Sequence, residues 1–169
     1  RAVRWRESGG DPGSIAPFRW AIPARGGDPA HADADKRGDV RGDAYGSPDG
    51  LWFDPRGLLW IQTDISTSAM NRGDYANLGN NMMLAADVAT GETRRFLVGP
   101  TGCEVTGVVM TPDLTTMFVD IQHPGESPSE RADPDRPKAT SSWPDGPSGG
   151  RPRSATIVVR RRDGGIVGS

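Results

Sequence analysis

Two acidic residues stand shortly before the glycine of two similar segments and could bind a cation. Asp49 comes directly before Gly50 and an apolar run, and Glu104 comes shortly before Gly107 and a similar run. Carboxylate oxygens are hard ligands that suit calcium, and they suit iron where charge must be neutralised. The competing interpretation of Asp49 is a turn residue before glycine, which is a common role for aspartate. Both are candidate metal ligands if the sequence places them at the start of converging strands.

Three further residues have reactive side chains, and each also has a structural explanation. His123 could act as an acid or a ligand, or its ring could bond a loop carbonyl at a strand end. Asp64 could hydrogen-bond a metal-binding residue without touching the metal, or it could anchor a loop. Cys103 is the only cysteine, which excludes an internal disulfide, and we interpret it as a small buried apolar residue. No Ser-His-Asp arrangement is discernible, because the only other histidine, His31, stands in a polar loop.

The composition indicates that strands position these residues. The chain of 169 residues contains 23 glycines and 15 prolines, and only 34% of its residues are apolar, which argues against a helical bundle. Short apolar runs flank turn residues, as in hairpins. The predicted hairpins pair residues 51–53 with 58–61, 81–88 with 94–98, 108–110 with 117–119, and 155–159 with 166–167. We therefore predict an all-β chain.

An internal repeat narrows the fold class. Residues 49–61 can be laid over residues 106–118: each has Gly, three apolar residues, Asp or Thr, Pro, a polar turn and a second apolar strand. Four strands per unit with a fixed opening are typical of a β-propeller blade. We predict a partial β-propeller of about two to three four-stranded blades from a larger ring, in which residues 3–5 and 18–22 are the outer strands of a preceding blade. An open β-sandwich of about ten strands is the alternative.

The domain organisation follows from the ends of the chain and from two irregular stretches. The chain begins with Arg1 and stops within an apolar run at residues 166–169, so we expect residues 1–169 to be the C-terminal fragment of a single propeller domain. Residues 26–47 and 124–152 are predicted to be long inserted loops. The acids of the first loop lack the alternation of an EF-hand, so we expect a solvated loop in preference to a calcium loop.

Charge and hydropathy exclude two classes of partner. Twenty basic residues against 22 acidic ones give a net charge of −2, so no basic excess favours nucleic acid. No apolar run approaches the ~18 residues of a membrane-spanning helix. We expect neither nucleic-acid binding nor a membrane span.

Five short and distinctive motifs follow one another along the chain. They are Ser-Pro-Asp-Gly-Leu (47–51), Ile-Gln-Thr-Asp (61–64), Gly-Cys-Glu-Val-Thr-Gly (102–107), Ile-Gln-His-Pro-Gly-Glu (121–126) and Ser-Trp-Pro-Asp-Gly (142–146), followed by Arg-Pro-Arg-Ser-Ala-Thr (151–156). In this order they resemble the C-terminal part of the PhoX-type alkaline phosphatases. The resemblance covers nearly the whole chain. Because the motifs occur together and in order, they are more specific than any one of them.

The resemblance implies an exported β-propeller enzyme that hydrolyses small phosphate monoesters with a cluster of Ca²⁺ and Fe³⁺ ions. It implies export by the twin-arginine route to the periplasm or the extracellular space. In that family other blades present a Pro-Glu-Asp motif whose Glu binds metal, and this match implies that Asp49 is a ligand and that Glu104 is similar in kind. The iron-binding Cys of the family belongs to an Asn-Cys-Ala-Gly motif, so Cys103 does not take that role. We expect an incomplete site, an inactive isolated fragment, and the rest of the parent propeller chain as its partner.

Two other classes remain open at this point. Asp-Gly-Leu-Trp-Phe-Asp (49–54) followed by an apolar strand also resembles the blades of calcium-dependent, gluconolactonase-type propellers. A non-catalytic propeller that serves as a binding module is the other alternative. An upstream Asn-Cys-Ala-Gly motif and a twin-arginine leader would favour the phosphatase over both.

Overall fold

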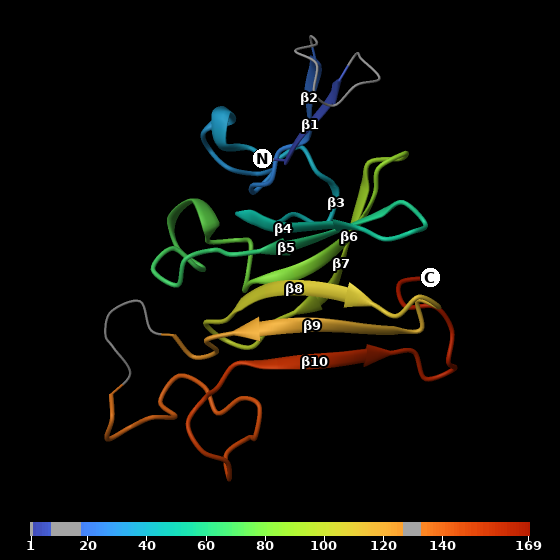
Figure 1. The fold of residues 1–169 in the computed structure, drawn as a ribbon. Helices are drawn as coiled ribbons and strands as arrows, with labels where there is room; N and C mark the ends of the chain where they lie inside the picture. The colour runs from blue at the N-terminus through green and yellow to red at the C-terminus, as the bar shows by residue number, and fades with distance from the viewer. Residues whose placement is uncertain (1, 8–17, 127–132) are drawn as a thin grey trace.

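The computed structural model describes residues 2–7, 18–126 and 133–169, which form three β-sheets (Figure 1). The strands are β1 (Ala2–Glu7), β2 (Phe18–Ala24), β3 (Arg41–Gly42), β4 (Pro48–Phe53), β5 (Leu58–Thr63), β6 (Met82–Asp87), β7 (Glu92–Val98), β8 (Glu104–Met110), β9 (Thr116–Gln122) and β10 (Ala155–Arg160). Two 3₁₀ turns, η1 (Ala34–Lys36) and η2 (Gly73–Tyr75), are the helical elements of these ranges. The prediction of an all-β chain is confirmed. Among the described residues, no helix is long and apolar enough to cross a membrane.

The sheets are built mainly from neighbouring strands. β1 pairs with β2, the order β3-β7-β6-β5-β4 forms a second sheet, and β10-β9-β8 forms a third. All pairs are antiparallel except that of the short β3, which runs parallel to β7. The first three predicted hairpins are confirmed. Residues 3–5 and 18–22 lie in two paired strands, and β4–β7 form a four-stranded meander, whereas the assignment of either to a propeller blade stays a prediction.

The fourth predicted hairpin is wrong. Residues 166 and 167 form no strand beside β10, and the Val167 N–H instead donates to the Leu114 carbonyl in the β8–β9 turn at 3.0 Å. The Asp163 carboxylate holds the turn after β10 by accepting from the Gly165 N–H and from Arg161. This turn leads the chain away from β10 and buries Val167 in the core.

Both copies of the repeat carry a bulge at their glycine. In the β4–β5 pair the register shifts between Pro48 and Leu51, and in the β8–β9 pair it shifts between Thr106 and Val108. Gly107 has a φ of +53°, a conformation that favours glycine. Both copies therefore have an irregularity near the glycine, but the two differ in conformation, because Gly107 has a positive φ and Gly50 does not.

One hydrophobic core joins the second and third sheets. Trp60 of β5 and Met83 of β6 are buried in it together with Val105 of β8 and Met117 of β9. The rings of Trp60 and Phe96 meet edge to face, with centroids 4.9 Å apart. Trp52 and Trp143 pack against the same core, so these two and Trp60 serve as packing residues, whereas Trp5 and Trp20 are exposed.

The long predicted loops contain local structure. Residues 26–47 include η1 and β3, and Tyr45 at the end of this segment is fully buried. Residues 127–132 of the second stretch lie outside the described residues. In the rest of it, Asp145 forms an ion pair with Arg153, directly after the stretch, and the Trp143–Pro144 peptide bond is cis. None of the three sheets of the described residues closes into a ring. The partial propeller and the domain assignment therefore stay predictions.

Candidate functional site

The ends of three strands place the candidate site on one side of the molecule. The segments that follow β5 and β9 lie on the same side as the start of β8, at the left of Figure 1. The Asp64 N–H donates to the Ser47 carbonyl at 3.0 Å, which holds the end of β5 beside the start of β4. Glu104 pairs with Gln122 across β8 and β9, so His123 follows immediately. The topology therefore gathers the sequence-predicted acids and His123 at this edge.

Glu104 is the least solvated acid of this group. Its side chain is 13% exposed, whereas Asp49 and Asp64 are exposed at the strand ends. Burial raises the pKa of the Glu104 carboxyl, the negative charges of Asp64 and Asp49 raise it further, and His123 opposes the shift in part. The structure thus brings the charges of Asp49 and Asp64 within electrostatic reach of Glu104. This concentration of negative charge favours a cation.

His123 stands between two carboxylates. Its Nε2 lies 3.5 Å from a Glu104 oxygen, and its Nδ1 lies 3.5 Å from a Glu126 oxygen. Its backbone has a φ of +35°, which is unusual for a residue with a side chain, and its N–H donates to the Ser154 hydroxyl at 3.0 Å. The Nδ1 atom is buried and has no hydrogen-bond partner among the residues that the structure describes. Within the described residues the expected bond from the ring to a loop carbonyl is not formed, and the ring contacts acids instead.

The donor set suits a hard cation and is incomplete by itself. Carboxylate oxygens from separate strands are the ligands that calcium prefers. In the part of the chain that the structure describes, however, no group of three or more His, Cys, Asp or Glu side chains is arranged to hold a metal ion. Asp49 and Glu104 could therefore supply only a part of a coordination sphere. The metal-ligand assignment of both residues stays a prediction.

Gln62 and Glu126 are two residues of this site that the sequence interpretation missed. Gln62 is 2% exposed, and its amide packs against Gly50 at the β4 bulge, where a Cβ atom would collide with the Gln62 side chain. Its Nε2 atom is buried without a partner. Glu126 follows His123 by three residues, and this short separation was the sequence feature that could have indicated their contact. The position of Gln62 under the bulge depends on strand register and has no local signal.

Cys103 takes no part in the chemistry. The residue is fully buried, and burial raises the pKa of its thiol to about 12. A thiol with such a pKa is protonated at neutral pH and is a poor nucleophile. Its backbone carbonyl accepts from the Asn81 amide at 2.9 Å, and Asn81 also bonds Ile65 and Thr63. The interpretation of Cys103 as a small core residue is confirmed.

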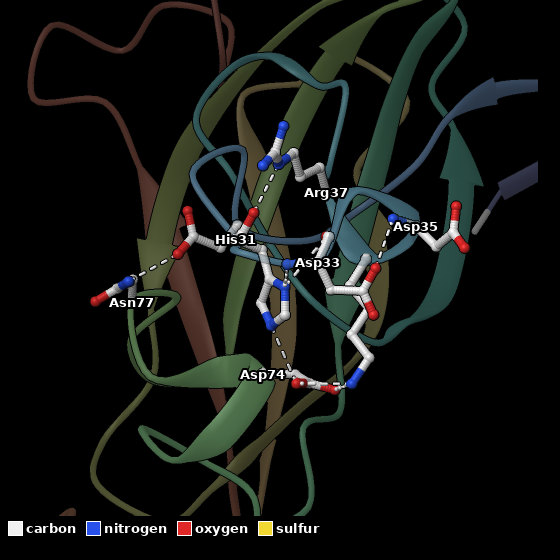
Figure 2. A network of polar contacts seen from close by, with 8 residues as sticks. His31, Asp33, Asp35, Arg37, Asp74 and Asn77 are labelled. Atoms are coloured by element: carbon white, nitrogen blue, oxygen red, sulfur yellow. Dashed lines mark hydrogen bonds and ion pairs between the residues drawn. The ribbon is translucent and has the colours of Figure 1, made fainter.

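His31 belongs to a separate polar network, which Figure 2 shows. The His31 Nδ1 accepts from the Asp33 N–H at 3.0 Å, so Nε2 carries the hydrogen and donates to Asp74 at 3.1 Å. The Lys36 ammonium bonds both oxygens of Asp74, and this interaction raises the Lys36 pKa. Asn77 bonds Asp28 at 2.7 Å. The network ties residues 26–47 to the η2 region, so His31 has a structural role.

Comparisons with known proteins were made for the whole chain. A family model described as alkaline phosphatase PhoX matches residues 1–125. A solved structure of Pseudomonas fluorescens PhoX, in complex with vanadate as a transition state analogue, superimposes with a TM-score of 0.81 and 45% sequence identity. The match covers 98% of this chain and 27% of that protein, so this chain spans about a quarter of the length of the protein it resembles. No curated protein gives a significant match.

Proposed function

Since this chain belongs to the PhoX alkaline phosphatase family, we propose that it forms the C-terminal part of a metal-dependent enzyme that hydrolyses phosphate monoesters. The family match and the 45% identity to a PhoX structure carry the proposal. The clustering of Asp49, Asp64 and Glu104 supports the metal dependence, because mutually repelling carboxylates are stabilised by a cation. The comparisons favour this activity over a gluconolactonase-type propeller or a non-catalytic binding module.

Asp49 and Glu104 would hold Ca²⁺ or Fe³⁺ together with residues outside this chain. Bound cations supply positive charge that offsets the charge of a phosphoryl group. Glu104 contributes a carboxylate that is shielded from water, and His123 restrains its orientation from 3.5 Å. Glu126 in turn faces the other ring nitrogen of His123. In this proposal the acids of this chain bind metal and take no part in proton transfer.

The family membership also supports three proposals about the parent protein. We propose that the β4–β7 meander is one blade of a β-propeller and that β8–β10 belong to the next blade. We propose that the rest of the parent chain completes the ring and the metal site. We further propose that the parent is exported and works in the periplasm or outside the cell.

A phosphatase assay on the full-length parent tests the proposed function. We expect it to release phosphate from p-nitrophenyl phosphate when calcium and iron are present, and to lose this activity after chelation. Readdition of the two metals should restore it. A metal-free parent with undiminished activity would contradict the metal dependence, and a metal-loaded parent without activity would contradict the phosphatase assignment.

The isolated 169-residue chain should be inactive in the same assay. It holds two of the predicted ligands, and a metal cluster needs more donors than these. Steady turnover by the isolated chain would show that the site lies elsewhere.

A further inference from the structure

One buried hydrogen-bond donor at the candidate site has no role in the proposal above. The Gln62 side chain is 2% exposed, and its Nε2 atom has no hydrogen-bond partner among the residues that the structure describes. By contrast, the buried amide of Asn81 donates to the carbonyls of Ile65 and Cys103. A buried N–H group without an acceptor costs free energy, because it has lost its bonds to water. The Gln62 amide is therefore available to an acceptor at this site.

The strand register places Gln62 beside a candidate metal ligand. The pairing of β4 with β5 shifts between Pro48 and Leu51. The two residues inside this shift, Asp49 and Gly50, therefore stand together opposite Gln62. Gly50 leaves room for the amide, because a Cβ atom at this position would overlap the Gln62 Oε1 atom. The Gln62 amide thus lies against the backbone next to Asp49.

The side chain of Gln62 points into the molecule, toward the third sheet. Gln62 pairs with Met83 of β6, and residues opposite each other in neighbouring strands place their side chains on the same face. Met83 is buried in the core that joins the second and third sheets, together with Val105 of β8. The amide therefore lies on the face of β5 that is turned toward β8, the strand that begins with Glu104.

A neutral donor suits a carboxylate that binds a cation. One carboxylate oxygen can coordinate the cation while the other accepts a hydrogen bond, and such bonds orient metal ligands. An arginine or a lysine in place of Gln62 would put a second positive charge beside the cation and weaken its binding. An amide donates without adding charge. The residue type at position 62 therefore fits a donor to a metal-binding carboxylate.

We propose that Gln62 is a positioning residue of the cation site, and that its Nε2 N–H donates to the Asp49 carboxylate when a cation is bound. The exposed side chain of Asp49 rotates toward the amide to form this bond. Because the bond provides an acceptor for a buried donor, it favours the cation-bound state. The inference rests on the proposed metal dependence and adds a residue that does not touch the metal.

The test measures calcium affinity and metal-free stability in the full-length parent. Gln62→Met keeps the approximate size of the side chain and removes the donor. We expect calorimetric titration to show calcium binding weakened about tenfold, as for the loss of a bond that orients a ligand. Urea denaturation of the metal-free protein should show a midpoint equal to or above that of the wild type, because a buried donor without an acceptor has been removed. A merely structural glutamine would give the opposite pair of results.

A second comparison links the effect to Asp49. In an Asp49→Ala parent the acceptor is absent, so the further change Gln62→Met should weaken calcium binding less than about twofold. Gln122→Met is the matched control, because Gln122 at the end of β9 also stands opposite an acid, Glu104, but is exposed and can bond water. It should leave affinity and stability unchanged.

The outcomes separate this inference from the proposed function. Wild-type calcium affinity in Gln62→Met overturns the positioning role. A loss of metal-free stability overturns it too, because the amide would then serve the fold. An undiminished effect of Gln62→Met in the Asp49→Ala parent shows that Asp49 is not the acceptor and also overturns it. A wild-type parent that binds no calcium overturns the proposed metal dependence itself.

Discussion

Two carboxylates, those of Asp54 and Glu104, are removed from solvent in very different surroundings. Asp54, in the β4–β5 turn, has a fully buried side chain, and Glu104, at the start of β8, has one that is 13% exposed. Asp54 accepts from the Arg56 guanidinium at 2.6 Å, from the Leu58 N–H at 3.2 Å and from the Trp60 indole at 3.3 Å. Glu104 faces His123 at 3.5 Å and lies near two further acids.

The two environments shift the pKa values in opposite directions. Burial alone would raise the pKa of the Asp54 carboxyl, but its bonds to Arg56, Leu58 and Trp60 outweigh burial and lower the pKa. For Glu104 burial and the neighbouring acids dominate, and the pKa is raised. The Asp54 carboxylate, whose hydrogen bonds outweigh the cost of burial, therefore stabilises the fold at one end of the molecule. The Glu104 carboxylate, at the other end, lacks such compensation and is available for a cation.

The largest expected effect, on the free energy of unfolding, follows from removing the buried and hydrogen-bonded carboxylate of Asp54. Asp54→Ala in the full-length parent should lower the free energy of unfolding by about 3 kcal/mol, because the change leaves buried donors without a partner. Urea denaturation measures this loss. Asp113→Ala is the control: this exposed acid also accepts bonds in a turn, from Thr111 and Thr115, and its loss should cost less than about 1 kcal/mol. Equal costs for the two variants would contradict the comparison.

A smaller effect, on calcium affinity, is expected from replacing His123, the neighbour of Glu104. His123→Gln should weaken calcium binding by the parent about tenfold, because Glu104 loses the ring that restrains it. Calorimetric titration with calcium measures the affinity. His31→Gln is the control, because His31 also faces a carboxylate, that of Asp74, in a network that serves structure. If both histidine variants bind calcium like the wild type, His123 does not position Glu104.

The smallest expected effect is a dependence of stability on acid pH. Because the pKa of folded Asp54 lies below the unfolded value, its contribution is complete above the unfolded pKa and is lost as the pH falls through the folded one. The stability difference between the wild type and Asp54→Asn should therefore shrink as the pH falls below the unfolded pKa of about 4 and on through the lower folded pKa. Urea denaturation at several pH values checks this. A difference that grows toward acid pH would reverse the assigned sign.

Local turn chemistry explains why much of the fold could be predicted from the sequence. The Asp54-Pro55-Arg56-Gly57 turn correctly predicted the β4–β5 hairpin, whereas the irregularity near the glycine of each repeat was found only in the structure. Ile166 and Val167 look like a strand because they are apolar. Their burial depends on a bond to the distant Leu114, which no local pattern reveals.

The candidate site was predictable in its residues and less so in its surroundings. Asp49 and Glu104 were identifiable because each stands shortly before the glycine of a repeated segment, and from the family resemblance. Gln62 lies under the β4 bulge because of strand register, and Glu126 faces His123 because Gly125 and Gly102 fold the turn back. Such contacts depend on long-range pairing, so they emerge only with the structure.

The most direct test is a double-mutant cycle on calcium affinity in the full-length parent, with Asp49→Asn, Glu104→Gln and the double variant. If the two carboxylates serve one cation cluster, each single change should weaken binding at least about tenfold. The double variant should then depart from the product of the two effects by a coupling of about 1 kcal/mol or more. Single variants that bind calcium like the wild type, or effects that simply multiply, would contradict a shared site.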